Sequence, residues 1–345
     1  MGQKYHEKYG VKAQLMTRFK ACFHTQSRSL EEVCACVDGG IPRGNTVITL
    51  DGNVCLNEVP LRKTSLQDYV CVFRSRLLEA MESAALVIVV FDEPEHLTDA
   101  KKAEQAWRDA RHAAAVPSHS HDIGSPFPTT DNYTMEELEA VVDCHNLCRG
   151  PGRPARNRFF DEVVRRTFAS LRSTIDAWCE EGQAVVVLFD GNDPRGALRP
   201  QGAPRQLGVF GSDAEVAALF DHAPVGEGDL KIEVIEERVR ELARRPVDPD
   251  ADYGWHNVRA VLSLTVDTDA FCTKLLETAR RQHEQSSSDV IGVLVLREKP
   301  KKGEFAPPGP TYTMCDFEQL YDELQEYMWS VAGVAPTPVQ ERTVM

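Results

Sequence analysis

Acidic side chains follow several apolar segments of this 345-residue chain, each at the point where the segment ends. These acids are Asp51, Asp92, the pair Glu227 and Asp229, and the pair Asp267 and Asp269. One such acid is ordinary, because Asp often begins the turn after a strand. Four groups placed alike indicate a site, because carboxylates that converge in one cleft repel one another unless a cation lies among them. Carboxylate oxygens suit Mg²⁺ or Mn²⁺, and two such ions about 4 Å apart could activate a water for in-line displacement at phosphorus.

Asp190 ends another apolar segment and competes with Asp92 for the second place in this set. We rank Asp190 lower because a cationic helical segment follows Asp92 and none follows Asp190. Within that segment Lys101 and Arg108 are seven residues apart, so a helix would present both cations on one face.

Alternating strands and helices are expected to position these residues. Apolar runs predict strands at 45–51, 85–92, 184–190, 258–267 and 289–297, with a shorter strand at 311–314. Helical patterns cover 65–84, 98–115, 135–148, 159–180 and 316–331, and the turn at 225–232 opens a further helix through Ala243. This order predicts an α/β domain with a central, mostly parallel sheet flanked by helices. In such a sheet ligands collect at the carboxyl ends of the strands, where the acids are expected to meet.

The domain organisation follows from the same pattern. We expect an N-terminal segment, 1–44, that packs on the core, then an α/β domain over 45–332 and a disordered tail at 333–345. An insertion over about 99–160 contains turn formers without periodicity at 116–132 and a basic stretch at 149–158. The basic stretch is either a soluble linker or part of a helical, partly mobile arch. Thr98 is expected to cap the helix that opens the insertion.

The charge and composition limit the classes of partner. A net charge of −14 argues against a polyanion partner, although bound metal ions would invert the local field that a phosphate meets. No run reaches the 18 or so apolar residues of a membrane span, and the N-terminus lacks the apolar core of a secretory signal. We therefore expect an intracellular protein, nuclear or cytoplasmic, without a membrane partner. The 10 irregularly spaced cysteines fit reduced thiols better than disulfides.

Two motifs resemble the 5′ nuclease superfamily. The turn Val225-Gly-Glu-Gly-Asp-Leu-Lys231 resembles the Gly-Glu-Gly-Glu-His-Lys turn of 5′→3′ exoribonucleases and the Glu-Ala-Glu/Asp turn of flap endonucleases. Asp267-Thr-Asp269 is similar to the paired acids of their next strand, and Phe91-Asp92 to their Phe-Asp or Cys-Asp pair. The resemblance implies a PIN-like fold with an arch insertion and two Mg²⁺ or Mn²⁺ ions held by the six acids named first. It also implies hydrolysis of RNA or DNA, and the exoribonuclease-like turn favours RNA.

The resemblance extends to basic residues. Lys101, Gln105 and Arg108 match the exoribonuclease spacing of Lys, Gln and Arg, which implies that Lys101 and Arg108 are catalytic phosphate clamps. The further residues expected to contact nucleic acid are Arg111, Arg153, Arg156 and Arg158. Asp316, in Met-Cys-Asp-Phe, is the candidate for the family's further metal ligand, or else the N-cap of the last helix. The helix-hairpin-helix with which flap endonucleases hold duplex DNA has no counterpart in the sequence.

Other functions fit some of these residues. A catalytically degenerate nuclease fold could serve as a binding or structural module, for example in a virus that has borrowed the fold. Asp267-Thr-Asp269 also mimics the Asp-x-Asp of haloacid-dehalogenase-type phosphatases, but Phe271 stands where that family needs Thr or Val. The segment Cys144-His-Asn-Leu-Cys148 could offer zinc ligands, yet a second properly spaced cluster is missing.

Overall fold

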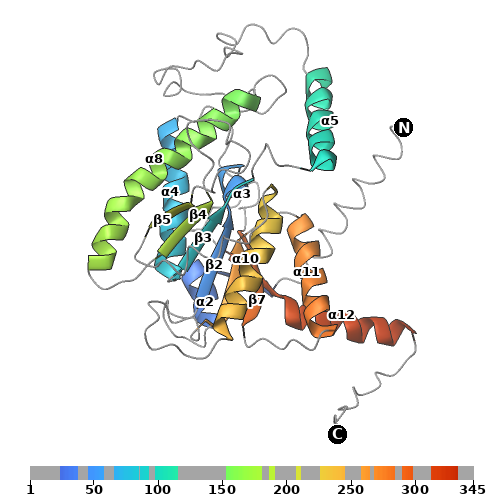
Figure 1. Cartoon of the computed structure of the whole chain (residues 1–345). Coiled ribbons are helices and arrows are strands. Elements are labelled where there is room, and N and C mark those ends of the chain that lie inside the picture. The colour runs from blue at the N-terminus through green and yellow to red at the C-terminus, as the bar shows by residue number, and fades with distance from the viewer. Residues whose placement is uncertain are drawn as a thin grey trace.

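A mixed eight-stranded sheet forms the centre of the protein, as seen in a computed structural model of the chain (Figure 1). The structure describes residues 24–37, 46–57, 66–84, 86–92, 98–115, 153–180, 186–190, 207–210, 226–244, 258–264, 268–283, 290–297 and 312–332. The strands are β1 (His24–Arg28), β2 (Thr46–Asp51), β3 (Leu86–Val90), β4 (Val186–Asp190), β5 (Leu207–Phe210), β6 (Ala260–Leu264), β7 (Ile291–Arg297) and β8 (Tyr312–Asp316). Their spatial order is β1-β8-β7-β6-β2-β3-β4-β5.

The inner strands β7, β6, β2, β3 and β4 are parallel, whereas β5, β8 and β1 are joined at the two sides by antiparallel pairing. From β2 the chain first builds the sheet through β3 and β4, and it then returns to the other side of β2 with β6 and β7. The boundary between β2 and β6 is therefore a topological switch point. In open α/β sheets ligands bind outside the carboxyl ends of the strands at such a point. Asp51, the last residue of β2, lies there.

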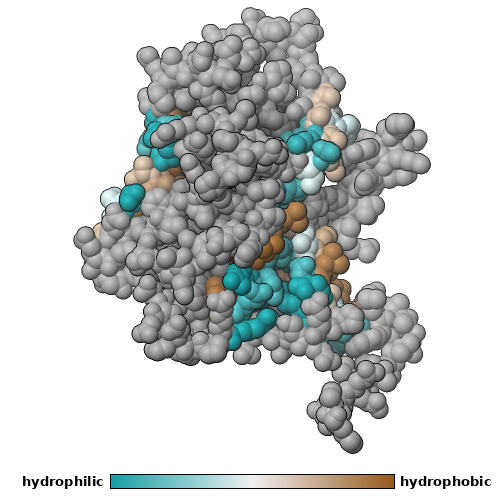
Figure 2. All heavy atoms as spheres, viewed as in Figure 1, coloured by the Kyte–Doolittle hydropathy of each residue, from teal (hydrophilic) through white to brown (hydrophobic). Residues whose placement is uncertain are grey.

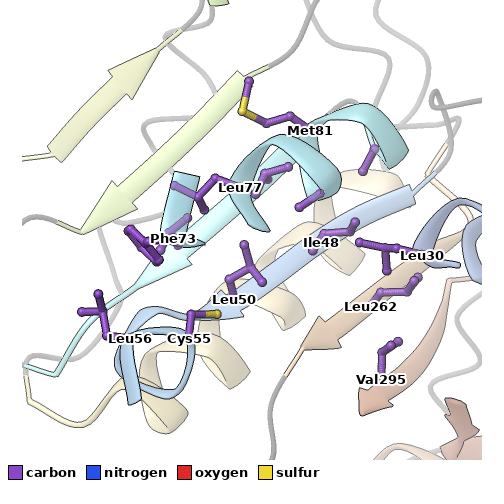
Figure 3. Close-up of a cluster of buried hydrophobic side chains, with 14 of the residues drawn as sticks. Leu30, Ile48, Leu50, Cys55, Leu56, Phe73, Leu77, Met81, Leu262 and Val295 are labelled. Carbon is purple, nitrogen blue, oxygen red and sulfur yellow. The ribbon is translucent and has the colours of Figure 1, made fainter. Parts of the chain in front are cut away.

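Helices cover both faces of the sheet. They are α2 (Leu30–Val37), α3 (Gly52–Asn57), α4 (Leu66–Ser83), α5 (Asp99–Ala115), α8 (Arg153–Glu180), α10 (Gly228–Ala243), α11 (Thr268–His283) and α12 (Phe317–Ala332). Side chains alternate along β2, so that Ile48 and Leu50 face a core formed with α2, α4 and α8, as Figure 3 shows in part. Val47 points the other way and packs in a second core with Ile232 and Ile235 of α10. Strands buried on both faces explain the continuous apolar runs in the sequence.

The exposed surface of α10 and α11 is charged toward the ends of the two helices. Figure 2 shows hydrophilic residues gathered there, with hydrophobic residues nearer the helix starts. The charges pair within each helix: Arg238 contacts Glu241 at 2.6 Å, and Arg280 contacts Glu277 at 2.8 Å. Exposed pairs of this kind contribute little to stability. Of the helices that the structure describes, none combines the length and apolar character needed to cross a membrane.

The structure confirms the mostly parallel α/β sheet with flanking helices and finds the predicted strands and helices within its described residues. One boundary was wrong: α8 begins at Arg153 rather than near 159, so part of the basic stretch is helical. Pro154 suits this start, because proline is tolerated in the first helical turn. The sequence patterns missed β1, α2, α3, β5 and α11. The predicted loop at 116–132, the helix at 135–148 and the tail at 333–345 lie outside the described residues.

Candidate metal centre

Asp51 joins the end of β2 to a short helix. Its Oδ1 accepts a hydrogen bond from the N–H of Val54 at 3.0 Å, as a capping residue at the start of α3 would. The residue is only 8% exposed. The next residue, Gly52, packs against the ring of Phe91, where a Cβ would lie 2.3 Å from a ring carbon. Glycine is therefore required for this close approach of the two strand ends.

Asp92 follows β3 and contacts the start of α10. Its Oδ1 accepts the N–H of Gly228 at 2.7 Å. The turn before this helix uses Gly226 with φ 117°, a conformation that favours glycine. Glu227 occupies the N-cap position, yet its own side chain makes no capping hydrogen bond. Asp92 thus satisfies a helix N–H from outside the helix, and the carboxylate of Glu227 is directed elsewhere.

Glu227 contacts the first turn of α5. The hydroxyl of Thr98 accepts the N–H of Lys101 at 3.3 Å, which confirms the predicted cap, and it donates to Oε1 of Glu227 at 3.2 Å. The ammonium of Lys101 lies 3.7 Å from Oε2 of Glu227, and both side chains are about one quarter exposed. Although partial burial lowers the pKa of Lys101, the charges of Glu227 and Asp92 hold it above its ordinary value. The predicted phosphate clamp Lys101 therefore lies beside the predicted metal ligands.

The carboxylates at this edge influence one another. Burial, followed by the charge of Asp229 and that of Asp92, raises the pKa of Asp51 to about 8, although the N–H groups of Val54 and Asn53 act in the opposite direction. Asp229 lies in the first turn of α10. Carboxylates grouped in this way remain ionised together only when a cation compensates their charge. Carboxylate oxygens are the ligands that hard divalent ions such as Mg²⁺ prefer.

The described carboxylates alone do not form a complete set of metal ligands. Among the side chains that the structure describes, no three of His, Cys, Asp or Glu are grouped so that they could hold a metal ion. One oxygen of Asp92 is bonded to Gly228, and Glu227 is bonded to Thr98 and Lys101. Asp267 lies outside the described residues, as does the side chain of Asp269. The backbone of Asp269 is in the first turn of α11, which follows β6 at the carboxyl edge beside β2.

The register places Asp316 away from these acids. β8 runs antiparallel to β7, and Asp316 pairs with Val293, which is level with Leu262 and, across β6, with Ile48. The backbone of Asp316 is therefore three strands and three residues from Asp51, roughly 17 Å away. The side chain of Asp316 lies outside the described residues, so its role as a further metal ligand stays a prediction. The alternative, an N-cap of the last helix, agrees with the start of α12 at Phe317.

The remaining predicted residues lie on described helices or in the core. Gln105 is half-buried on α5. The backbones of Arg108 and Arg111 belong to α5 and those of Arg153, Arg156 and Arg158 to α8, while their side chains lie outside the described residues. Phe271 is 1% exposed and packs on Phe317 with ring centroids 5.1 Å apart. Its aromatic side chain is thus explained by packing.

The burial of Lys231 and a buried network behind the site were not predicted. The ammonium of Lys231 donates to the carbonyl oxygen of Phe91 at 2.9 Å, and the residue is 0% exposed. Deeper in the fold, Glu236 of α10 accepts hydrogen bonds from Thr49, Ser263 and Lys274. The sequence contained a signal for this network, because the polar residues Thr49 and Ser263 interrupt otherwise apolar strands. The two residues are register partners in the sheet. Buried hydroxyls at such positions require a partner.

Neither a scan against protein-family models nor a search of the curated proteins found a match to this chain. The structure itself defines an α/β protein with an acidic cluster at the switch point of its sheet.

Proposed function

We propose that this chain is a divalent-metal-dependent nuclease of the 5′ nuclease kind, which hydrolyses phosphodiester bonds of RNA or DNA. The observation that carries the proposal is the burial of Asp51 beside Asp229 and Asp92 at the carboxyl edge of the sheet. Their mutual repulsion is removed most simply by a divalent ion. The resemblance of the 225–231 turn and of Asp267-Thr-Asp269 to the 5′ nucleases supports the same conclusion.

In this proposal the residues have distinct tasks. Asp51, Asp92, Glu227 and Asp229 would hold Mg²⁺ or Mn²⁺, directly or through water, with Asp267 and Asp269 completing the set. Bound ions of this kind lower the pKa of a water and stabilise a leaving oxygen. Lys101 would hold the scissile phosphate, because its ammonium already lies at the acidic cluster. Arg108 and the other basic residues of α5 and α8 would bind the nucleic-acid backbone, with RNA preferred.

One observation favours a second candidate, a degenerate nuclease fold that binds without cleaving. The carboxylates that the structure describes do not group as a three-ligand metal site. A binding module would retain the sheet and the basic helices but would not need the ions. Binding and cleavage must therefore be measured separately.

Cleavage of 5′-labelled RNA and DNA oligonucleotides, with Mn²⁺ or with a chelator, tests the proposal. The wild type should degrade at least one substrate only with metal. Asp51→Asn and Asp92→Asn should each lose about a thousandfold in rate, because metal ligation supplies several kcal/mol of transition-state stabilisation. Glu241→Gln is the matched control, since it removes one negative charge from the far end of α10. Oligonucleotide binding by the wild type without cleavage under any metal would support the second candidate instead.

A further inference from the structure

Two hydrogen bonds connect the end of β3 to the start of α10 near the candidate metal centre. Lys231 donates from its ammonium to the carbonyl oxygen of Phe91 at 2.9 Å. Gly228 donates its N–H to Oδ1 of Asp92 at 2.7 Å. Both donors belong to the first turn of the helix, and both acceptors belong to two consecutive residues. We call this pair of bonds the β3–α10 clamp.

The clamp depends on the burial of the Lys231 ammonium and on the absence of a side chain at Gly228. Lys231 is 0% exposed, and burial of an ammonium is unfavourable unless it is hydrogen-bonded. Gly228 allows Asp92 to approach, since a Cβ at this position would lie 3.2 Å from Oδ1 of Asp92. A lysine that served only as a surface cation would not need this environment. Both features act on the position of the same carboxylate.

We propose that Lys231 is a positioning residue of the metal centre. Its bond to Phe91 fixes the main chain that carries Asp92, and the bond from Gly228 fixes the orientation of the Asp92 carboxylate. One Asp92 oxygen remains for a metal ion, because a carboxylate accepts at both oxygens. The same contacts fix the start of α10, from which Glu227 and Asp229 extend. Lys231 acts through these ligands and contacts neither metal nor substrate.

This inference rests on the proposed function, and titration of the protein with Mn²⁺ alone tests it. Lys231→Met keeps much of the side-chain volume and removes the donor. We expect its Mn²⁺ affinity to fall by about ten- to a hundredfold, as is typical when residues that orient metal ligands are replaced. Excess Mn²⁺ should restore much of the cleavage rate. Lys274→Met is the matched control, because it also removes a buried, hydrogen-bonded ammonium, but one that binds Glu236.

Isothermal titration calorimetry with unfolding curves distinguishes the outcomes. The control Lys274→Met, provided that it is folded, should keep the Mn²⁺ affinity within about twofold, because distant sites are nearly independent. If Lys231→Met fails to fold, Gly228→Ala decides, since its added Cβ displaces Asp92 without removing a charge and should also weaken binding. The positioning role alone is overturned if folded Lys231→Met, or Gly228→Ala in its place, binds Mn²⁺ with wild-type affinity. It is also overturned if Lys274→Met loses Mn²⁺ affinity to the same extent. A wild type that binds no Mn²⁺ overturns the proposed function and this inference together.

Discussion

Two carboxylate regions lie along the same helix, and they differ in what surrounds them. Asp229 and Glu236 are seven residues apart on α10, so they lie on one face about two turns apart. Around Glu236, Oε2 accepts from Lys274 at 2.6 Å and Oε1 accepts from Thr49 at 2.8 Å, with Ser263 as a further donor. Asp229 lies near other carboxylates instead: its charge and that of Asp92 both raise the pKa of Asp51.

The pKa values of Glu236 and Asp51 shift in opposite directions. Burial alone would raise the pKa of Glu236, but the charges of Lys274 and Arg240 hold it below the ordinary value. Burial, Asp229 and Asp92 raise the pKa of Asp51 to about 8. The same sheet and helix therefore carry two different groups of acids. The charge of Glu236 is compensated by Lys274, whereas Asp51 lies near the like charges of Asp229 and Asp92. In the first region the fold supplies the partners of its own carboxylates, and the second is where we expect an added cation to act.

Loss of Lys274 should have the largest effect on stability. Lys274→Met leaves Glu236, which is 1% exposed, and Glu233, whose Oε1 lies 3.1 Å from the ammonium, without this partner. Breaking a buried pair in this way costs about 3–5 kcal/mol. Urea unfolding measures the loss, and Lys101→Met, which removes a partly exposed cation at the acidic cluster, should cost less than about 1 kcal/mol. Equal losses in the two variants would contradict the contrast between the regions.

A substitution in the acidic cluster should change stability in the opposite direction and make the protein more stable. The folded pKa of Asp51 is about 8 and its unfolded value is 3.8, so the folded protein binds more protons between these pH values. With a chelator present, the contribution of Asp51 to the free energy of unfolding should therefore be most favourable below about pH 4, and it should fall as the pH rises to about 8. Asp51→Asn should stabilise the metal-free protein at pH 8 by on the order of a few kcal/mol and change little near pH 4.

Unfolding midpoints of the wild type and Asp51→Asn at pH 5, 7 and 8.5 check this sign. Glu241→Gln is the control, because this acid lies near the end of α10, away from the cluster at its start. A uniform destabilisation by Asp51→Asn at every pH would mean that Asp51 is a satisfied structural cap and not a strained member of a like-charged group.

Packing where the two strand ends meet should give a smaller effect. A Cβ on Gly52 would lie 2.3 Å from the ring of Phe91, which is 4% exposed, so Gly52→Ala must displace a buried aromatic side chain. Overpacking of this kind costs about 1–3 kcal/mol. Gly228→Ala is the comparison, because the nearest atom to its Cβ would be Oδ1 of Asp92 at 3.2 Å, and the next are backbone atoms at an ordinary 3.8 Å. Thermal unfolding that ranks Gly228→Ala as the more damaging change would disprove this account of the packing.

The sequence predicted the central strands because each is buried on both faces and reads as a continuous apolar run. It did not predict β1, with the sequence HTQSR, because an edge strand forms its pairing through backbone groups and carries no apolar signal. The sequence did not predict the helix α3, because its six residues are too few to show helical periodicity. Strand ends located Asp51 and Asp92 correctly at the parallel carboxyl edge. They did not show that β8, which ends in Asp316, runs antiparallel to β7, because local sequence does not state the direction of a strand.

Contacts across long sequence separations were beyond prediction for a different reason. Thr98 was expected only to cap α5, yet its hydroxyl also donates to Glu227, 129 positions away. Nothing in either segment specifies the other, and only the fold brings them together. The same holds for Lys231 and Phe91, which are separated by 140 positions.

The smallest expected effect concerns Thr98, which connects α5 to the acidic cluster. Thr98→Ala removes the acceptor for the Lys101 N–H and the donor to Glu227, and a lost N-cap costs about 1 kcal/mol. The loss should be local, because α5 contributes no side chain to the described hydrophobic clusters. Hydrogen exchange should therefore accelerate at the first amides of α5 while α4 and α10 remain protected, and Thr98→Ser, which keeps the hydroxyl, should restore most of the protection. Faster exchange across α10 as well would show that Glu227 needs this contact to hold its own helix start, which would join the acidic cluster to the stabilising part of the fold instead of separating the two.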